Sequence, residues 1–365
     1  MREKQDYYFN ESLNLLKKLI AIPSFSKEEG KVADLWKEWL EDHGVKEVKR
    51  FHNNVYALSE NFDHSKPILL LNSHLDTVRP VGTYTRDPFS ADIENGKLYG
   101  LGSNDAGGAG VSLASVFLQH YGRKDLPFNL LFAITAEEEC TGELGMRAFL
   151  PHLKESGIYP DMAIVGEPTE CKAAIAERGL VVCDAEVKGV AGHAARNIGI
   201  NAIYRACDDI KKLQNFHWEK ESEILGPIKV SVTMINAGTQ HNIIPDRCHY
   251  VVDLRTTDAY SNEETVNILQ KSVEWSLLTP RSTRIRASVL DETSPLFKAA
   301  KNIGMETFVS PTTSDMSIMY DISSIKIGPG KSERSHTADE FILIEELEEG
   351  LDVYNRFLNL LTSTI

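Results

Sequence analysis

Five short segments of the chain place a histidine or a carboxylate directly after an apolar run or beside a glycine turn. In the first segment, Ser73-His74-Leu75-Asp76, the imidazole of His74 and the carboxylate of Asp76 lie two residues apart. On an extended chain, two such side chains share one face. A histidine that binds a metal ion commonly donates its second ring N–H to a nearby carboxylate. The segment therefore fits a metal ligand with its orienting partner, although a structural histidine is the simpler explanation of a lone His-x-Asp.

Two further segments add carboxylates. Asp105 lies in the glycine-rich turn 100–108, and the run Glu137-Glu138-Glu139 follows the apolar residues 128–136. Adjacent carboxylates repel one another unless a cation or a proton compensates for them, so the acidic run favours a functional role. The alternatives are a strand-to-helix turn that Asp105 caps and a solvated acidic surface. The turn lacks the dinucleotide-binding fingerprint because Asp105 replaces its third glycine, which argues against an NAD-dependent enzyme.

The last two segments also follow strand-like runs. Glu167 stands between the apolar residues 161–165 and Pro168, and His336 comes shortly after the turn 328–330. Glu167 also fits an ordinary solvated turn. Taken together, the candidates are two histidines and several carboxylates, a ligand set that zinc accepts in catalytic sites. Because pairs of metal ions about 3.5–4 Å apart recur in hydrolases, the five segments favour a two-metal hydrolase.

The elements that must position these residues alternate between apolar strands and amphipathic helices. Apolar strands suit a sheet that is covered on both faces, and the alternation predicts an α/β layer fold. In such sheets, sites form at the carboxyl ends of the strands. We expect strands at 67–73, 128–136, 161–165 and 325–327. We expect helices at 107–120, 297–303 and 344–361, another around 32–40, and an N-terminal helix that Asn10 caps and Pro23 ends.

The middle of the chain has a different pattern. Strand-like segments are 177–189, 228–236, 248–256 and 284–290, and helical segments are 201–216 and 263–278. The order β-α-β-β-α-β is typical of a ferredoxin-like unit. We therefore expect an inserted domain at 178–291 and a discontinuous catalytic domain formed by 1–177 and 292–365.

Composition narrows the function classes. The formal net charge of -14 excludes the basic footprint of a nucleic-acid-binding protein. No apolar run reaches the ~18 residues that would span a membrane, and the polar first ten residues do not resemble a secretory signal. Five scattered cysteines form neither a disulfide framework nor a zinc knuckle. We therefore expect a cytoplasmic protein that contacts neither nucleic acid nor membrane.

In this order, the five segments resemble the motifs of the M20 metallopeptidase family, in particular its acetylornithine deacetylase and N-acyl-amino-acid deacylase branch. The resemblance covers essentially the whole chain, including the inserted domain. It implies a zinc-peptidase-like catalytic domain with a mixed central sheet flanked by helices, and a ferredoxin-like α+β insertion that serves as lid and dimerisation domain. It also implies a homodimer that binds two Zn²⁺ ions per subunit, with Co²⁺ as an alternative.

The resemblance implies a role for each matching residue. The metal ligands would be His74 and Glu167 on one ion, Glu139 and His336 on the other, and Asp105 as the bridge between them. Glu138 would act as the general base, and Asp76 would orient His74. A lysine is usual shortly after the bridging aspartate, whereas this chain has Ala106 next to Asp105. We expect activity to survive this change, because the missing lysine is not a ligand.

The inserted domain and the C-terminal part would complete the site. His193, in the segment 189–193, would reach the active site of the other subunit and stabilise the oxyanion. The residues expected to contact substrate are Arg178, Asn242, Arg255 and Ser314. From the residues alone, each of these five fits an ordinary turn or surface position as well.

We therefore expect hydrolysis of the amide bond of an N-acyl-L-amino acid, N-acetylornithine or N-acetylcitrulline of arginine biosynthesis. One alternative is a broad aminoacylase or a di- or tripeptidase of the same family. Another is a catalytically silent binding protein on the same fold. The complete set of ligands and base argues against the silent protein.

Overall fold

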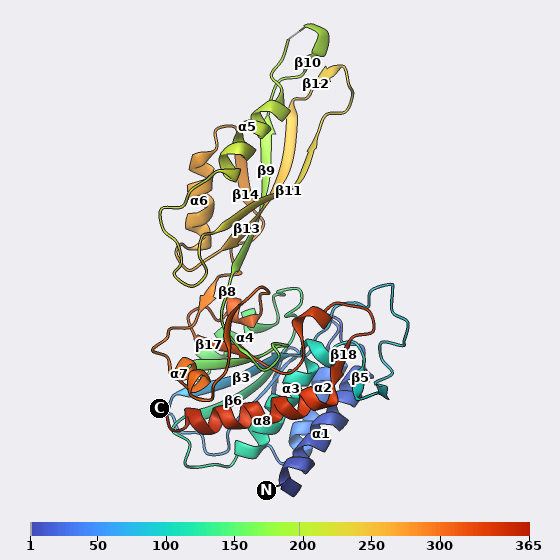
Figure 1. Ribbon diagram of the computed structural model, residues 1–365, viewed down its shortest axis with the longest axis vertical. Coiled ribbons are helices and arrows are strands. Elements are labelled where there is room, and N and C mark those ends of the chain that lie inside the picture. The colour runs from blue at the N-terminus through green and yellow to red at the C-terminus, as the bar shows by residue number, and fades with distance from the viewer. Residues whose placement is uncertain (1, 197) are drawn as a thin grey trace. The chain divides into compact units, whose positions relative to one another are not determined.

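The computed structural model describes residues 2–196 and 198–365 (Figure 1). The chain forms two compact units. Unit 1 contains Met1–Ile175, Leu290–Phe308 and Ser314–Ile365, and unit 2 contains Ala176–Val289 and Val309–Thr313. Each unit has its own hydrophobic core, and each is described separately below.

The central sheet contains nine strands, most of them in unit 1, whereas β15 and the last residues of β8 and β16 are assigned to unit 2. Eight of them follow the order β1-β2-β6-β3-β7-β17-β8-β15, and β16 pairs with β8. The strands are β1 (Lys49–Phe51), β2 (Asn54–Leu58), β3 (Ile68–His74), β6 (Asn129–Thr135), β7 (Met162–Gly166), β8 (Ala173–Glu177), β15 (Ser288–Val289), β16 (Thr307–Ser310) and β17 (Ser323–Ile327). The inner strands β6, β3, β7 and β17 are mutually parallel, whereas β1, β2, β8 and β15 pair antiparallel. The predicted mixed central sheet is therefore confirmed.

The inner strands are buried along their whole length, as their apolar runs predict. Leu71 of β3 lies beside Phe132 of β6 and Ile164 of β7, and all three side chains are fully buried. Alternate side chains point to opposite faces of the sheet, so each face needs its own cover. Parallel alignment brings the carboxyl ends of these strands to one edge of the sheet.

Helices supply that cover. They are α1 (Arg2–Ile20), α2 (Gly30–Asp42), α3 (Gly108–His120), α4 (Met146–Glu155), α7 (Pro295–Asn302) and α8 (Ile344–Leu361). All of these helices except α4 contribute to the larger core on one face of the sheet, and α4 packs on the other face. Figure 1 shows α8 and α1 running alongside the sheet. The helix α3 is buried on nearly every side, which explains its almost continuous apolar sequence.

The predicted start of the first helix is wrong. Asn10 does not cap it, because α1 already begins at Arg2 and Asn10 lies inside the helix. Tyr8 and Phe9 pack against the core and extend the helix towards the N-terminus. A small sheet with strands β4 (Ile93–Glu94), β5 (Lys97–Tyr99) and β18 (Phe341–Leu343) completes unit 1.

Unit 2 is a four-stranded antiparallel sheet with two helices. Its sheet order is β11-β13-β9-β14, and a separate ribbon pairs β10 with β12. The elements are β9 (Gly179–Lys188), β10 (Gly192–His193), α5 (Ala202–Gln214), β11 (Lys229–Ala237), β12 (Ile243–Ile244), β13 (Arg247–Thr256), α6 (Asn262–Ser272) and β14 (Ser276–Pro280). The helices cover one face of the sheet and share a core with it.

The last helix and the last strand of unit 2 differ from those predicted from the sequence. The helix predicted over 263–278 stops at Ser272, and the fourth strand of the sheet is β14 rather than 284–290. One contribution comes from Asp209 on α5, whose carboxylate accepts the backbone N–H groups of residues 274, 275 and 276, and another from the pairing of β14 with β9. These bonds hold the backbone in an extended path. The short strand β15, within 284–290, instead pairs with β8.

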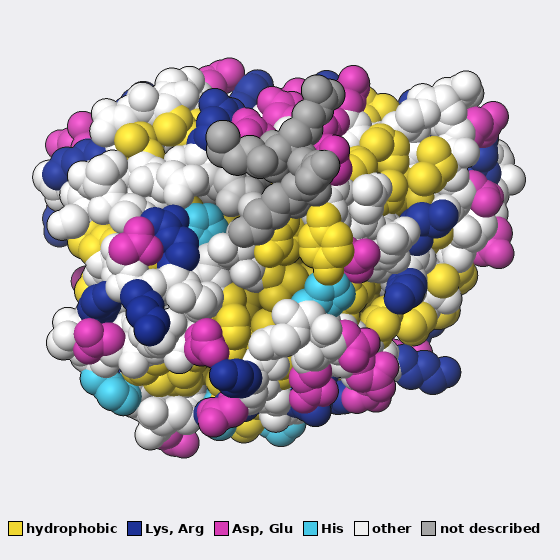
Figure 2. Space-filling model, turned by 90° about the horizontal axis from the view of Figure 1, so that it is seen from below, with side chains coloured by type: hydrophobic (Ala, Val, Ile, Leu, Met, Phe, Trp, Pro, Cys, Tyr) yellow, Lys and Arg dark blue, Asp and Glu magenta, His cyan; other side chains and the backbone are white. Residues whose placement is uncertain are grey.

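Charged side chains of both signs are dispersed over the face of the molecule that Figure 2 shows. Figure 2 shows acidic and basic side chains interspersed over that face, with hydrophobic side chains gathered near its middle. The acidic excess therefore does not form one continuous patch on this face. Among the described residues, no helix is long and apolar enough to cross a membrane.

Candidate active site

The carboxyl ends of three neighbouring parallel strands bring the first candidates together. His74 is the last residue of β3, Glu138 and Glu139 follow β6, and Glu167 follows β7. Ser73 ties two of these strand ends together, because its Oγ atom donates to the backbone carbonyl of Gly166 at 2.8 Å. His74 is buried, and its Nε2 atom lies 3.8 Å from Oε1 of Glu167. The sheet itself therefore builds one half of the predicted site.

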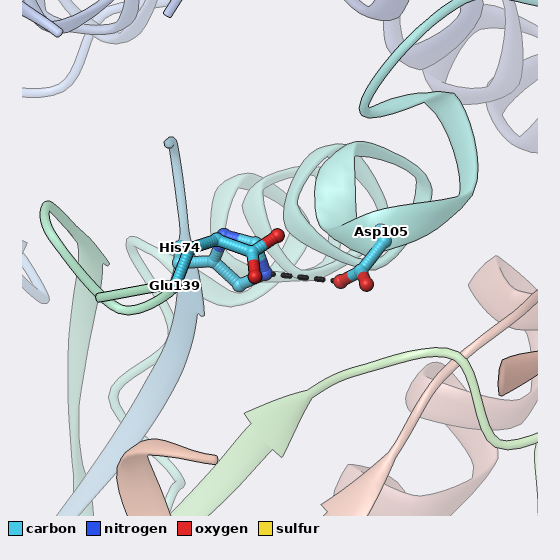
Figure 3. Close-up of side chains that lie close together, drawn as sticks. All are labelled: His74, Asp105 and Glu139. Carbon is cyan, nitrogen blue, oxygen red and sulfur yellow. Dashed lines mark hydrogen bonds and ion pairs between the residues drawn. The ribbon is translucent and has the colours of Figure 1, made fainter. Parts of the chain in front are cut away.

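Asp105 enters from the glycine-rich turn that precedes α3. Its Oδ1 atom lies 3.2 Å from Nε2 of His74. Figure 3 marks this contact with a dashed line. The Oδ2 atom of Asp105 lies 3.6 Å from Nε2 of His336. One carboxylate therefore stands between two imidazoles, which is the arrangement expected of a bridging ligand.

His336 and Glu139 form the other half of the site. Nε2 of His336 lies 2.9 Å from Oε2 of Glu139. Two groups of three side chains each bring one ligand atom within 4.8 Å of one another, namely His74, Asp105 and Glu139, and His74, Glu138 and Glu167. The predicted ligands and the predicted base thus share one region, although neither group repeats the pairing that the resemblance implied.

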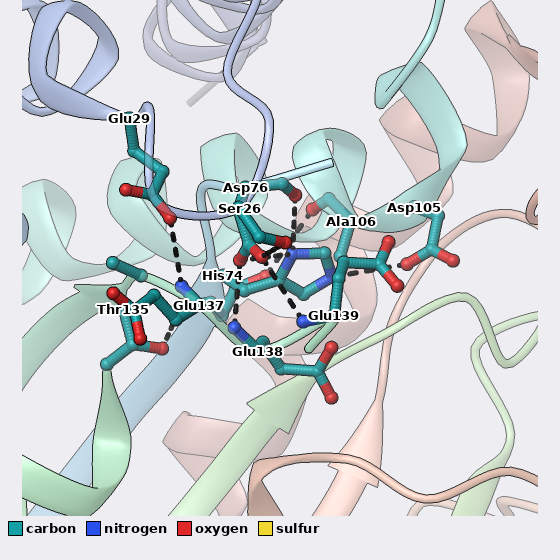
Figure 4. Close-up of polar contacts among 12 residues, drawn as sticks. Ser26, Glu29, His74, Asp76, Asp105, Ala106, Thr135, Glu137, Glu138 and Glu139 are labelled. Carbon is teal, nitrogen blue, oxygen red and sulfur yellow. Dashed lines mark hydrogen bonds and ion pairs between the residues drawn. The ribbon is translucent and has the colours of Figure 1, made fainter. Parts of the chain in front are cut away.

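Asp76 ties His74 to the acidic loop behind β6. Nδ1 of His74 lies 2.9 Å from the backbone carbonyl of Asp76 and 3.6 Å from its carboxylate. That carboxylate accepts the backbone N–H of Glu138 at 3.0 Å and of Glu139 at 3.2 Å, contacts visible in Figure 4. It also accepts the hydroxyl of Ser26 at 2.7 Å. Asp76 therefore orients the imidazole of His74, and it also holds the backbone of Glu138 and Glu139.

The first residue of the acidic run has a structural place. Glu137 is buried, and its carboxylate accepts the backbone N–H of Leu144 at 3.1 Å. Its own N–H donates to the buried carboxylate of Glu29 at 3.2 Å. These bonds hold the acidic loop in place and leave Glu138 and Glu139 as the carboxylates that face the site.

Crowded carboxylates raise proton affinity in the site. Burial, reinforced by the carboxylates of Glu167, Asp315 and Glu139, raises the pKa of Glu138 well above its ordinary value. Burial also raises the pKa of Glu167 to about 8, against the opposing effect of His74. Carboxyl groups that hold a proton near neutral pH are typical of general acid and base residues.

The two imidazoles respond to the same carboxylates. A hydrogen bond with Glu139 raises the pKa of His336 to about 9. Burial opposes a charge on His74, yet its contacts with Asp105 and Asp76 raise its pKa well above the ordinary value. The site therefore attracts protons, and it would attract metal cations for the same reason.

The donor set fits divalent metal ions. Imidazole nitrogens and carboxylate oxygens are the ligands that zinc accepts in catalytic sites, and the described candidates supply both kinds at short range. An oxygen- and nitrogen-rich site also suits cobalt. The arrangement can hold two cations, one on each side of the Asp105 carboxylate.

The remaining catalytic candidate lies in unit 2. His193 is exposed on β10, and its Nδ1 atom accepts the backbone N–H of Ala195 at 3.2 Å. A neutral imidazole with Nδ1 as acceptor carries its proton on Nε2 and can donate it to a ligand. The backbone carbonyl of Asn242, the residue before β12, accepts the N–H of Ala194 at 3.0 Å. The ribbon thus brings His193 and Asn242 close together.

The candidate substrate residues are engaged in other contacts. The guanidinium of Arg178 donates to the backbone carbonyls of Pro227, at 2.9 Å, and Leu225. Arg255 donates from Nε to the Asp253 carboxylate at 2.9 Å. These two arginines and the residues of the ribbon belong to unit 2, whereas the candidate metal ligands belong to unit 1.

Ser314 belongs to unit 1 and begins a short helical turn. It is buried, and its Oγ atom accepts the backbone N–H of Met316 at 3.3 Å. The next residue, Asp315, is also buried, and its carboxylate accepts the hydroxyl of Thr135 at 2.7 Å. This contact brings the turn to the end of β6, next to the acidic loop.

The sequence reasoning missed several supporting residues. Ser26 and Glu29 lie between the first two helices, far from the site along the chain, and no spacing pattern marks them. Glu340 is a buried carboxylate that accepts three backbone N–H groups of the turn that carries Asp105. Its position shortly after His336 was the only signal that could have indicated it.

Comparison with known proteins agrees with this geometry. Two similar curated proteins are succinyl-diaminopimelate desuccinylases. The one from Anaplasma marginale is 25% identical over 375 residues, covering 96% of this chain and 97% of that protein. The one from Thiobacillus denitrificans is 26% identical over 371 residues, covering 96% and 94%.

Solved structures share the fold over nearly the whole chain. Aminopeptidase PepT from Bacillus cereus superposes with a TM-score of 0.76 at 18% identity, covering 97% of this chain and 98% of that chain. A dinuclear metal-binding peptidase of the M20 family from Bacillus subtilis superposes with a TM-score of 0.73 at 18% identity, covering 99% and 100%.

The family itself follows from the sequence profile that matches the chain. The profile of peptidase family M20/M25/M40 matches residues 70–360, which include every candidate metal ligand. This match confirms the predicted class of enzyme, a metal-dependent amidohydrolase. The chain therefore belongs to peptidase family M20/M25/M40.

Proposed function

We propose that the protein is a dizinc amidohydrolase that cleaves the amide bond of an N-acyl-L-amino acid. The observation that carries the proposal is the position of Asp105, whose carboxylate oxygens face His74 at 3.2 Å and His336 at 3.6 Å. With Glu167 beside His74 and Glu139 beside His336, two adjoining donor sets share one carboxylate. This arrangement supports two zinc ions per subunit, and cobalt would suit the same donors.

The residues of the chain then have distinct tasks. Zinc bound there would lower the pKa of a water molecule towards ~7 and polarise the acyl carbonyl. Glu138 takes the proton of the attacking water and passes it to the leaving amine. Its buried, acidic surroundings support this task because they raise its proton affinity. Asp76 orients His74 and fixes the backbone of Glu138.

The oxyanion needs a further hydrogen-bond donor. We assign this task to His193 of the partner subunit. Nδ1 of His193 accepts a backbone N–H, which leaves its Nε2–H as the donor. One such donor is typically worth about 3 kcal/mol of transition-state stabilisation. Roles in substrate binding for Arg178, Asn242, Arg255 and Ser314 stay predictions, as does a cytoplasmic location.

A homodimer would bring that histidine to the site. The support comes from unit 2, where β11 is an edge strand of the sheet. Met234 and Ile235 on β11 are 56% and 49% exposed, and Tyr204 on the neighbouring helix α5 is 71% exposed. Apolar side chains beside a strand edge favour pairing with a second copy of the same chain.

The acyl group and the amino acid are open to a direct test. N-acetylornithine and N-acetylcitrulline are our first candidates, from the motif resemblance. N-succinyl-diaminopimelate is the second, because the similar curated proteins are named for it. We would measure hydrolysis of these three amides and of di- and tripeptides, together with the zinc content of the same samples.

Each result of this panel has a definite meaning. Turnover of one acyl amino acid far above the peptides would support the proposal and name the substrate. Preference for peptides would replace it with a peptidase function. Two bound zinc ions without hydrolysis of any amide would favour a silent binding protein.

A further inference from the structure

Glu340 is a buried carboxylate outside the proposed ligand set. Only 2% of the surface of Glu340 is exposed. Its Oε1 atom accepts the backbone N–H groups of Asn104 and Asp105, each at 2.9 Å, and its Oε2 atom accepts that of Gly102 at 3.2 Å. Its backbone carbonyl also accepts the N–H of Gly100 at 2.9 Å. One residue thus fastens most of the turn that carries a proposed metal ligand.

The shape of that turn explains why a carboxylate is needed. Gly102 has φ +78, a left-handed conformation that glycine adopts without strain. The chain then continues into an irregular turn, and the N–H groups of residues 102, 104 and 105 point towards one place. Such converging amides form a concave site for an anion. A glutamine would offer only one acceptor oxygen and would face the amides with donors of its own.

A second link joins the same two segments. We call residues 100–107 the aspartate loop and residues 328–340 the histidine loop. The side-chain amide of Asn104 donates to the carbonyl of Lys331 at 3.0 Å, and its oxygen accepts the Lys331 N–H at 2.9 Å. A Cβ atom at Gly330 would lie 2.4 Å from that oxygen, so the contact requires glycine there.

The proposed ligands lie on opposite sides of these links. Asp105 belongs to the aspartate loop and His336 to the histidine loop, and their nearest ligand atoms are 3.6 Å apart. In contrast, His74 and Glu167 stand at the ends of neighbouring sheet strands, and the pairing of those strands helps to hold them. The segment after Glu167 also contacts the histidine loop, because the N–H of Thr169 donates to the carbonyl of Gly328 at 3.2 Å. Movement between the loops would therefore disturb the His336 half of the site more than the His74 half.

We propose that Glu340, assisted by Asn104, is a positioning residue that sets the distance between Asp105 and His336 and so shapes the second cation site. The proposal rests on the proposed dizinc function. Glu340 touches neither substrate nor cation in this role. Its effect passes through the backbone of Asp105, whose N–H it binds.

The chain offers a matched control for a purely structural role. Asp209 in unit 2 is also fully buried, and its carboxylate also accepts three backbone N–H groups, at residues 274, 275 and 276. Asp209→Asn should lower the melting temperature much as Glu340→Gln does. It should not change the binding of metal, because no proposed ligand lies on the segments it joins.

The test is a zinc titration of metal-free protein, with melting temperature measured on the same samples. Wild type should bind two equivalents, and His336→Ala, which removes a ligand of the second site alone, identifies the step that belongs to that site. Glu340→Gln should weaken the second step by about 10–100-fold and the first step less, as loss of outer-sphere support commonly does. Asn104→Ala should weaken the second step in the same direction by a smaller factor.

The outcomes separate this inference from the function on which it rests. If wild type binds no pair of zinc ions, the dizinc function fails and the inference fails with it. If wild type binds two and both steps are unchanged in Glu340→Gln, the inference alone is overturned. If Glu340→Gln does not fold, Asn104→Ala decides: a weaker second step supports the inference, and wild-type binding overturns it.

Discussion

The Oδ1 atom of Asp76 accepts the backbone N–H of Glu138 at 3.0 Å. The residue that contacts the imidazole of His74 therefore also fixes the proposed general base. The Oδ2 atom of Asp76 accepts the N–H of Glu139 at 3.2 Å, so the same carboxylate also holds a proposed ligand of the second ion. Base, ligand and imidazole are thus positioned by one side chain, and disturbing it should affect all three.

Asp76→Asn should weaken both metal binding and turnover. An amide group cannot accept both backbone N–H groups, and an unsatisfied buried donor costs about 1–3 kcal/mol. We expect a lower melting temperature and metal affinity reduced by about 10–100-fold. Zinc titration and thermal melting check this, with Asp87→Asn as the control, because the carboxylate of Asp87 accepts the local N–H of Phe89 in an exposed turn. Wild-type metal affinity in Asp76→Asn would contradict the assigned role.

Glu138→Gln should separate catalysis from metal binding. The amide cannot accept the proton of water, so turnover should fall by roughly 10²–10⁴-fold while both zinc ions stay bound. Glu143→Gln on the same loop is the control, because Glu143 is exposed and should leave both properties unchanged. Loss of zinc from Glu138→Gln would mean that Glu138 is a ligand and that the roles of Glu138 and Glu139 are exchanged.

Metal binding should release protons at neutral pH. The pKa of His336 is raised to about 9 by Glu139, and burial raises that of Glu167 to about 8, so both groups are largely protonated at pH 7 without metal. Each must lose its proton to bind zinc. Apparent zinc affinity should therefore rise with pH up to about 9.

Calorimetry in buffers of different ionisation enthalpy measures these protons directly. At pH 7, His336→Gln should release about one proton fewer than wild type, because glutamine carries none. Zinc affinity that stays constant between pH 6 and 9, with no proton release, would show that these groups are not ligands.

The assignment of His193 to the partner subunit can be tested by mixing two inactive variants. Each of Glu138→Gln and His193→Ala should be nearly inactive alone. In a mixed dimer, one site combines an intact Glu138 with an intact His193 from the other subunit. After random exchange of subunits, about one site in four should be active. No recovery of activity in the mixture, despite proven exchange, would place both residues in the same subunit's site or remove His193 from the mechanism.

The oligomeric state should depend on the edge of unit 2. Replacing Met234 by Glu introduces a charge beside β11 and should shift the dimer towards monomer in sedimentation experiments. Leu277→Glu is the matched control, because Leu277 is 61% exposed on β14, at the opposite edge of the same sheet. A Met234→Glu protein that sediments like wild type would exclude the β11 edge as the interface.

The sequence predicted the sheet of unit 1 well, because its inner strands are apolar on both faces. The run that ends at His74 lies between two parallel neighbours and is buried throughout. The candidate ligands came from the order of five motifs, since no single spacing along the chain would bring Asp105 and His336 together. Their meeting depends on how two loops pack against each other.

Other features depend on contacts that a pattern does not contain. Residues 273–278 follow a helix directly, and contacts with Asp209 and pairing with β9 hold them in an extended conformation. The supporting role of Glu340 depends on the left-handed conformation of Gly102, which aims the amides of its turn. In both cases the deciding partner is distant along the chain.

The most direct test of the central claim is a crystal structure of the zinc-loaded protein with anomalous diffraction at the zinc edge. The account predicts two peaks about 3.5–4 Å apart. One should lie beside His74 and Glu167 and the other beside Glu139 and His336, with one oxygen of Asp105 on each. A single peak, or two peaks that Asp105 does not join, would contradict the bridged two-metal site.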